Sequence, residues 1–165
     1  MLRVRSALAV AAMILGLGLS PARADECAGC TREAMAEIHL QSAPNQTQVD
    51  QRGGPHRAAA VQRGTSNRIG IAQQGRGHSV SVAQTGDNNT AIVRQLGRNN
   101  TASVTQTGSN NAACLIQVGR NTNATLTQTG GQSTGIIQTP CGTREVPVEV
   151  CAATRFGRGG ALFQR

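Results

Sequence analysis

Lysine, tryptophan and tyrosine are missing from this 165-residue chain, and only two phenylalanines occur. Acidic residues are also scarce, because 8 Asp and Glu face 16 basic residues, and the resulting net charge of +8 comes from arginine alone. With 1% aromatic and 38% hydrophobic residues, the chain cannot form a large core of interlocking bulky side chains. An ordinary globular enzyme is therefore a poor expectation.

Catalytic motifs are lacking as well. No G-x-S-x-G, phosphate-binding loop or H-E-x-x-H occurs. The histidines are His39, His56 and His78, and Asp87 is the sole acid between Gln51 and Thr139. We therefore predict no enzymatic activity and name no catalytic, cofactor-binding or metal-binding residue.

Residues 1–24 have the features of a secretory signal peptide. Arg3 and Arg5 precede an apolar run over residues 7–19, and the triplet at residues 22–24, Ala-Arg-Ala, fits the small-x-small cleavage rule. Because the run is short for a bilayer, an uncleaved anchor is the weaker alternative. We expect an exported mature protein that begins at Asp25.

A repeat organises the centre of the chain. Glutamine returns every eleven residues, at Gln51, Gln62, Gln73, Gln84, Gln95, Gln106, Gln117 and Gln128. A glycine follows two places later, at Gly53, Gly64, Gly75, Gly86, Gly97, Gly108, Gly119 and Gly130. The fifth place is polar and holds His56, Asn67, His78, Asn89, Asn100, Asn111, Thr122 and Ser133. The seventh and ninth places are apolar or small, from Ala58 and Ala60 to Gly135 and Ile137, and this alternation is typical of strands.

Each unit divides into a strand and a glycine-containing turn. Q-T-G turns, such as Gln84 to Gly86, alternate with Q-x-G-R turns, such as Gln73 to Arg76, so each type returns every 22 residues. The predicted fold is all-β: a flattened two-sheet β-solenoid, β-helix-like, of 11-residue strand–turn units with 22 residues per coil, amyloid-like when polymerised. A disordered Gln/Asn-rich linker would not keep these positions in phase.

The unit Gln-x-Gly-x-x-Asn-x5-Gln, as in residues 62–73, 84–95 and 95–106, resembles the repeat of the curlins, the subunits of bacterial curli amyloid fibres. The resemblance implies export through a dedicated outer-membrane curli pore, then polymerisation with itself and other curlin subunits into a cell-surface fibre, or fimbrium. Such fibres support biofilm, adhesion and aggregation. Whether the chain is a major or a minor, nucleating subunit stays open.

Stacked amides in register can hydrogen-bond their copies above and below. The resemblance, carried over position by position, implies a fibre-core ladder of Gln62, Asn67, Gln73, Gln84, Asn89, Gln95, Asn100, Gln106, Asn111 and Gln117, to which the period adds Gln128. The glycines from Gly64 to Gly130 are the expected turn residues. His56, His78, Thr122 and Ser133 depart from the family's asparagine.

Two surface features suggest partners. Arg76, Arg98 and Arg120 share one turn position and predict a charged column, which either delays aggregation or binds a polyanion such as extracellular DNA or acidic polysaccharide. One sheet is expected to show a Ser/Thr face, which supports the alternative of a monomeric solenoid that binds ice or another surface. The other sheet is expected to show outward apolar rows that include Ile92, Cys114 and Ile116.

The flanks differ from the array. We divide the chain into a signal peptide (1–24), a leader (25–44) with a possible helix over residues 31–40, the array (45–139), and a Cys-bounded segment with a basic tail (140–165). Cys27, Cys30, Cys141 and Cys151 are disulfide candidates, with Cys141 to Cys151 the preferred pair and bonds to a neighbouring subunit an alternative. Cys114 is expected to be a small hydrophobe. The tail, with Arg155 and Phe156, is predicted to attach to the outer surface of the cell.

Overall fold

The structure is a computed structural model and describes residues 2–6, 35–42 and 44–150. Its strands are β1 (Leu2–Ser6), β2 (Met35–Gln41), β3 (Gln46–Gly53), β4 (Arg57–Arg63), β5 (Arg68–Arg76), β6 (Ser79–Thr85), β7 (Thr90–Arg98), β8 (Thr101–Thr107), β9 (Ala112–Arg120), β10 (Asn123–Thr129), β11 (Ser133–Thr139) and β12 (Gly142–Val146). The described part of the chain has no helix that is long and apolar enough to cross a membrane.

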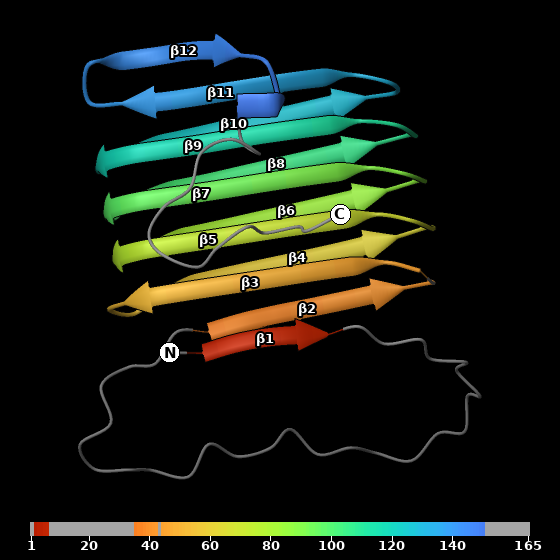
Figure 1. Cartoon of the computed structure of the whole chain (residues 1–165), viewed down its shortest axis with the longest axis horizontal. Helices are drawn as coiled ribbons and strands as arrows, with labels where there is room; N and C mark the ends of the chain where they lie inside the picture. Colours follow the sequence, from red (N-terminus) through yellow and green to blue (C-terminus); the bar gives the residue numbers. More distant parts are fainter. Residues whose placement is uncertain (1, 7–34, 43, 151–165) are drawn as a thin grey trace, which may run out of the picture.

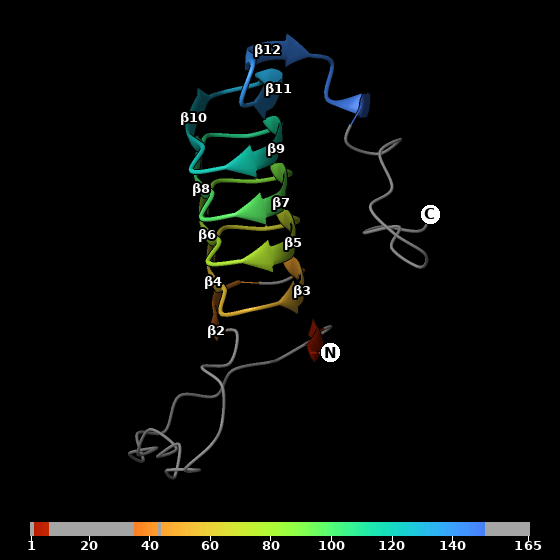
Figure 2. The same ribbon diagram turned by 90° about the vertical axis from the view of Figure 1, so that its left-hand side faces the viewer.

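The strands form a two-sheet β-solenoid (Figures 1 and 2). One sheet has seven strands in the order β1-β3-β5-β7-β9-β11-β12, and the other has five in the order β10-β8-β6-β4-β2. The chain alternates between the sheets, so β2 and β3 make the first coil and β10 and β11 make the fifth. Gln73 pairs with Gln95 and Gln95 with Gln117, which confirms the predicted coil of 22 residues.

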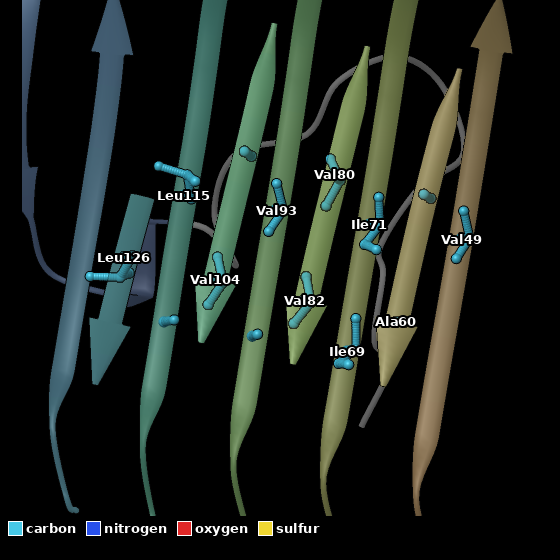
Figure 3. Packing of buried hydrophobic residues seen from close by; sticks show 14 residues of the cluster. Val49, Ala60, Ile69, Ile71, Val80, Val82, Val93, Val104, Leu115 and Leu126 are labelled. Carbon is cyan, nitrogen blue, oxygen red and sulfur yellow. The ribbon is translucent and has the colours of Figure 1, made fainter. Parts of the chain in front are cut away.

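The core is thin and aliphatic. The seventh-place and ninth-place residues of the repeats point between the sheets, as Ile69, Ile71, Val80 and Val82 do in Figure 3. Small residues such as Ala58 and Ala60 share this layer with larger ones such as Leu115. Because each coil buries only a few aliphatic groups, worth roughly 1.5–3 kcal/mol per large side chain, stability must be summed over many coils.

Two predictions about element boundaries have different outcomes. The strand expected to begin near Asn45 is present as β3. The helix expected over residues 31–40 is wrong for residues 35–40, which belong to β2, while residues 31–34 lie outside the described part. Residues Ala36, Ile38 and Leu40 alternate with exposed neighbours, and the ladder offered by β4 satisfies the backbone of β2. Tertiary pairing therefore overrides a weak helical preference.

Candidate functional site

Two ladders of buried glutamines run along the solenoid axis. In the seven-stranded sheet the Nε2 of Gln51 donates to Oε1 of Gln73 (2.7 Å), and the series continues through Gln95 and Gln117 to Gln138. In the five-stranded sheet Gln62 donates to Gln84 (2.9 Å), and Gln106 and Gln128 follow in the same way. In the described part of the chain each ladder bond points from an earlier coil to a later one, so each ladder has a direction.

Each interior glutamine also joins the two sheets. The Nε2 of Gln95 donates to the backbone oxygen of Ser79 (3.1 Å), and Gln84 does the same to Arg68 (3.2 Å). Both amide protons of these side chains are therefore used inside a layer from which water is excluded. A buried amide without such partners would cost about 1–3 kcal/mol per unsatisfied group.

The fifth-place residues form a second set of polar columns at the turns. The Oδ1 of Asn67 accepts the backbone N–H of Asn89 (3.0 Å), and the Oδ1 of Asn89 accepts that of Asn111 (3.0 Å). The Nδ2 of Asn67 donates to the backbone oxygen of Arg63 in its own turn (3.2 Å) and to that of Gly86 in the next coil (2.7 Å). A single side chain thus closes its own turn and holds the next coil in register.

His56 and His78 take the asparagine place on the opposite edge. Their rings stack with centroids 5.1 Å apart and planes 12° from parallel. The Nδ1 of His56 accepts the backbone N–H of His78 (3.3 Å), and the Nδ1 of His78 accepts that of Asn100 (3.2 Å). Each Nε2 donates to a backbone oxygen, that of Arg52 or Gln74. Both ring nitrogens of each histidine are therefore engaged as the asparagine amide would be.

The turn glycines stack so closely that no side chain fits between them. Gly97 has a φ of +119°, and a Cβ built on it would lie 1.9 Å from the backbone oxygen of Gly119. A second left-handed position lies two places after the glycine, where Asn-type residues that tolerate a positive φ were expected in the turn. It holds Ser66, Asn88, Asn99, Asn110 and Asn121, with φ between 54° and 61°. The recurring small or Asn residue at that place was the available signal.

The last coil corrects the register expected for Ser133, Gly135 and Ile137. The backbone N–H of Gln132 donates to Oδ1 of Asn111 (3.0 Å), so Gln132 takes the fifth place in this coil. Ile136 then pairs with Leu115 and packs on the core, while Ile137 pairs with Ile116. This coil is one residue shorter than the others, and a shift of one residue exchanges the two faces of a strand. The 21-residue spacing from Gln117 to Gln138 was the missed signal.

Opposite edges of the solenoid differ in charge. Arg76, Arg98 and Arg120 are exposed and pair in register along successive strands of one sheet. The other edge carries Asp87, whose Oδ1 accepts the hydroxyl and the backbone N–H of Thr65, both at 2.7 Å. These two hydrogen bonds, the hydroxyl's first, lower the pKa of Asp87.

The model of the curlin associated repeat matches residues 64–97 and 97–130. The chain contains two curlin repeats. The matched segment spans β5 to β10, where the glutamine ladders and the turn glycines are most regular, so the resemblance found in the spacing of Gln, Gly and Asn is confirmed. No curated protein and no solved structure matches the chain.

The outer face of the seven-stranded sheet in this curlin-repeat protein differs from expectation. The rows containing Cys114 and Ile116 are buried, because Val148 and Val150, which follow β12, pack on them. Arg94, which pairs with Ile116 in the same row, is also buried, and its burial lowers the pKa of the guanidinium. A local sequence pattern identifies an apolar row, but it does not show that a distant segment of the same chain covers it.

Cysteine pairing is a second correction. Cys114 is disulfide-bonded and is not merely a small hydrophobe, whereas Cys141 is free and exposed. The preferred bond from Cys141 to Cys151 is therefore wrong, because Cys141 lies in the turn that joins β11 to β12 and has no sulfur partner there. Cys27, Cys30 and Cys151 lie outside the described residues, as does the basic tail.

Proposed function

We propose that this curlin-repeat protein is a structural subunit of a curli-type amyloid fibre on the bacterial cell surface, where the fibre supports biofilm, adhesion and aggregation. The directional glutamine ladder carries the proposal. A ladder that bonds coil to coil inside one chain can bond the last coil of one chain to the first coil of the next by the same geometry. The curlin repeats support a fibre subunit of this general type.

The proposed assembly site consists of the ladder residues and turn glycines. The ladder residues are Gln62, Asn67, Gln73, Gln84, Asn89, Gln95, Asn100, Gln106, Asn111, Gln117 and Gln128, and the glycines run from Gly64 to Gly130. Their role in a fibre is to repeat the strand spacing of about 4.8 Å across subunit boundaries. Export through an outer-membrane pore and attachment by the tail over residues 152–165 complete the proposal, with the protein secreted after removal of residues 1–24.

The deciding experiment uses the purified chain from Asp25 onward. Incubation should give thioflavin-positive fibres that seed fresh protein, with a fibre-diffraction reflection near 4.8 Å along the fibre axis. Thermal hysteresis by a stable monomer that forms no fibre would instead support the surface-binding alternative. The feature that supports this alternative is the Ser/Thr face of the five-stranded sheet, with exposed Ser81, Thr101 and Thr125.

A further inference from the structure

The two ends of the solenoid are not equivalent. Between β2 and β11 all neighbouring strands in both sheets are parallel. At the C-terminal end β12 reverses direction and pairs with β11 antiparallel, with Ile136 opposite Glu145 and Gln138 opposite Thr143. Among the described residues the five-stranded sheet ends at β10 and has no corresponding strand. Figure 2 shows β12 above β11 at this end.

This added strand prevents a second solenoid from stacking on the C-terminal end. β12 extends one sheet by one strand, about 4.8 Å, while the other sheet stays at the level of β10. An incoming coil cannot reach hydrogen-bonding distance of β12 and β10 at once. It would also meet an antiparallel strand where its own parallel register requires β11.

The N-terminal end instead offers, within the described part of the chain, an unused hydrogen-bond acceptor of the ladder. Among the described residues no donor reaches Oε1 of Gln51, although Oε1 of Gln73, Gln95 and Gln117 each accept a ladder bond. β3 is covered there by β1, which is antiparallel to it. β1 belongs to the segment expected to be cleaved, and without it no other described strand covers β2 or β3 at this end, so that Oε1 of Gln51 can accept an amide proton.

The matching donor is Gln138, which lies on β11, the strand that pairs with β12. The Nε2 of Gln138 donates to the backbone oxygen of Asn123 (2.9 Å), and the bond to a following glutamine, which interior members make, is missing among the described residues. In the interior coils each glutamine uses one amide proton for such a backbone oxygen and the other for the next glutamine of the ladder, as Gln95 does. Gln138 and Gln51 are therefore the two complementary ends of one ladder, and β12 covers the strand that carries Gln138.

We propose that β12 is a removable cap that makes assembly one-sided: the protein binds through β2 and β3 to the C-terminal end of a second copy only after β12 of that copy has left β11. The inference rests on the proposed function. It adds that subunits join in one direction and that β12 slows fibre growth. A subunit that joins by its N-terminal end, with its own β12 in place, stops growth at that end.

The test compares the unaltered chain with three variants, all beginning at Asp25. The uncapped variant combines Thr143→Pro with Arg144→Pro. Adjacent residues of an antiparallel strand point their N–H groups to opposite sides, so one of the two prolines must remove a hydrogen-bond donor to β11. A chain ending at Thr139 removes β12 without proline and serves if the first variant misfolds. The matched control, Val148→Ser with Val150→Ser, loosens the packing on Cys114 and Ile116 but leaves β12 unchanged.

Seeded elongation measured on single fibres should be about tenfold faster for the uncapped chains, as expected when one or two net hydrogen bonds no longer oppose growth. The control should grow as slowly as the unaltered chain. Unaltered chain added in small proportion should also slow the elongation of uncapped fibres at the end that it joins. Equal elongation of capped and uncapped chains at both fibre ends would overturn the cap while leaving the fibre function intact. Failure of every chain to form fibres would overturn both.

Discussion

At the residue scale, the glutamine in each unit is both a core residue and a register marker. Its side chain is fully buried at positions such as Gln62, Gln84 and Gln117, yet every amide has partners. An apolar side chain of similar length would fill the space without selecting one register. The polar atoms restrict stacking to the one alignment in which like residues meet, which is the property that a self-templating fibre requires.

Replacing Gln95 by alanine tests that role. The change removes an acceptor for Gln73 and donors to Gln117 and to the Ser79 oxygen. We expect a loss of about 3 kcal/mol in the free energy of unfolding, because the groups left behind are buried. Denaturant titration of the soluble chain measures this loss. The control is Gln74→Ala, at the exposed position next to Gln73, which should lower the free energy of unfolding by less than about 0.5 kcal/mol. Equal effects of the two changes would contradict the ladder's contribution.

The stacked histidines predict a pH response. Burial lowers the pKa of His78, the hydrogen bond to the Gln74 oxygen opposes this, and the nearby His56 lowers it further. Because the folded-state pKa lies below the unfolded value of 6.5, neutral His78 stabilises the fold fully above that pH and progressively less as the pH falls through the folded pKa. Protonation would also place a proton on Nδ1 against the N–H of Asn100.

Urea midpoints measured from pH 7.5 down to pH 5 should therefore fall. His78→Asn restores the amide used at the other fifth places and should reduce that dependence while keeping the fold. An unchanged slope in this variant would assign the pH response to other groups.

At the element scale, the turns decide how closely the coils approach. Gly97→Ala would force a Cβ against the Gly119 oxygen and strain a φ of +119°, so we expect a loss of about 4 kcal/mol or more and a failure of fibres to seed. Gly130→Ala has the same chemistry at a φ of +66° with nothing within 4 Å, and should cost about 1–2 kcal/mol. Circular dichroism with thermal melting separates the two, and equal losses would show that stacking distance does not matter.

At the scale of the whole molecule, the column of three arginines would recur in every subunit of the proposed fibre. Two unit charges about 4.8 Å apart repel by roughly 0.9 kcal/mol in water before salt screens them, so the column slows assembly without preventing it. The same column offers a polyanion such as DNA a charged stripe whose affinity falls with salt.

Replacing Arg76, Arg98 and Arg120 together by serine tests both roles. Faster thioflavin kinetics would support the delaying role, and loss of salt-dependent DNA binding by the fibres would support the binding role. DNA binding that persists unchanged would exclude the column as the DNA site. Arg63→Ser, at an exposed position on the opposite edge, is the charge control.

The eleven-residue period alone was sufficient to determine the fold class, the two alternating edges, the 22-residue coil and the inward side of almost every strand. These features repeat locally: each unit encodes the same strand, the same turn and the same inward residues, and eight copies reinforce one phase. The spacing of Gln51, Gln73 and Gln95 therefore predicts by itself that they lie in one column.

Only the tertiary structure decided what happens where the repeat ends. The reversal of β12, the one-residue shift at Gln132, the covering of Ile116 and the disulfide at Cys114 all depend on segments that depart from the period. A periodic sequence specifies how each coil meets its copy. It carries no such instruction for a segment without a copy, whose position is set by whichever open edge or apolar face the folded array presents.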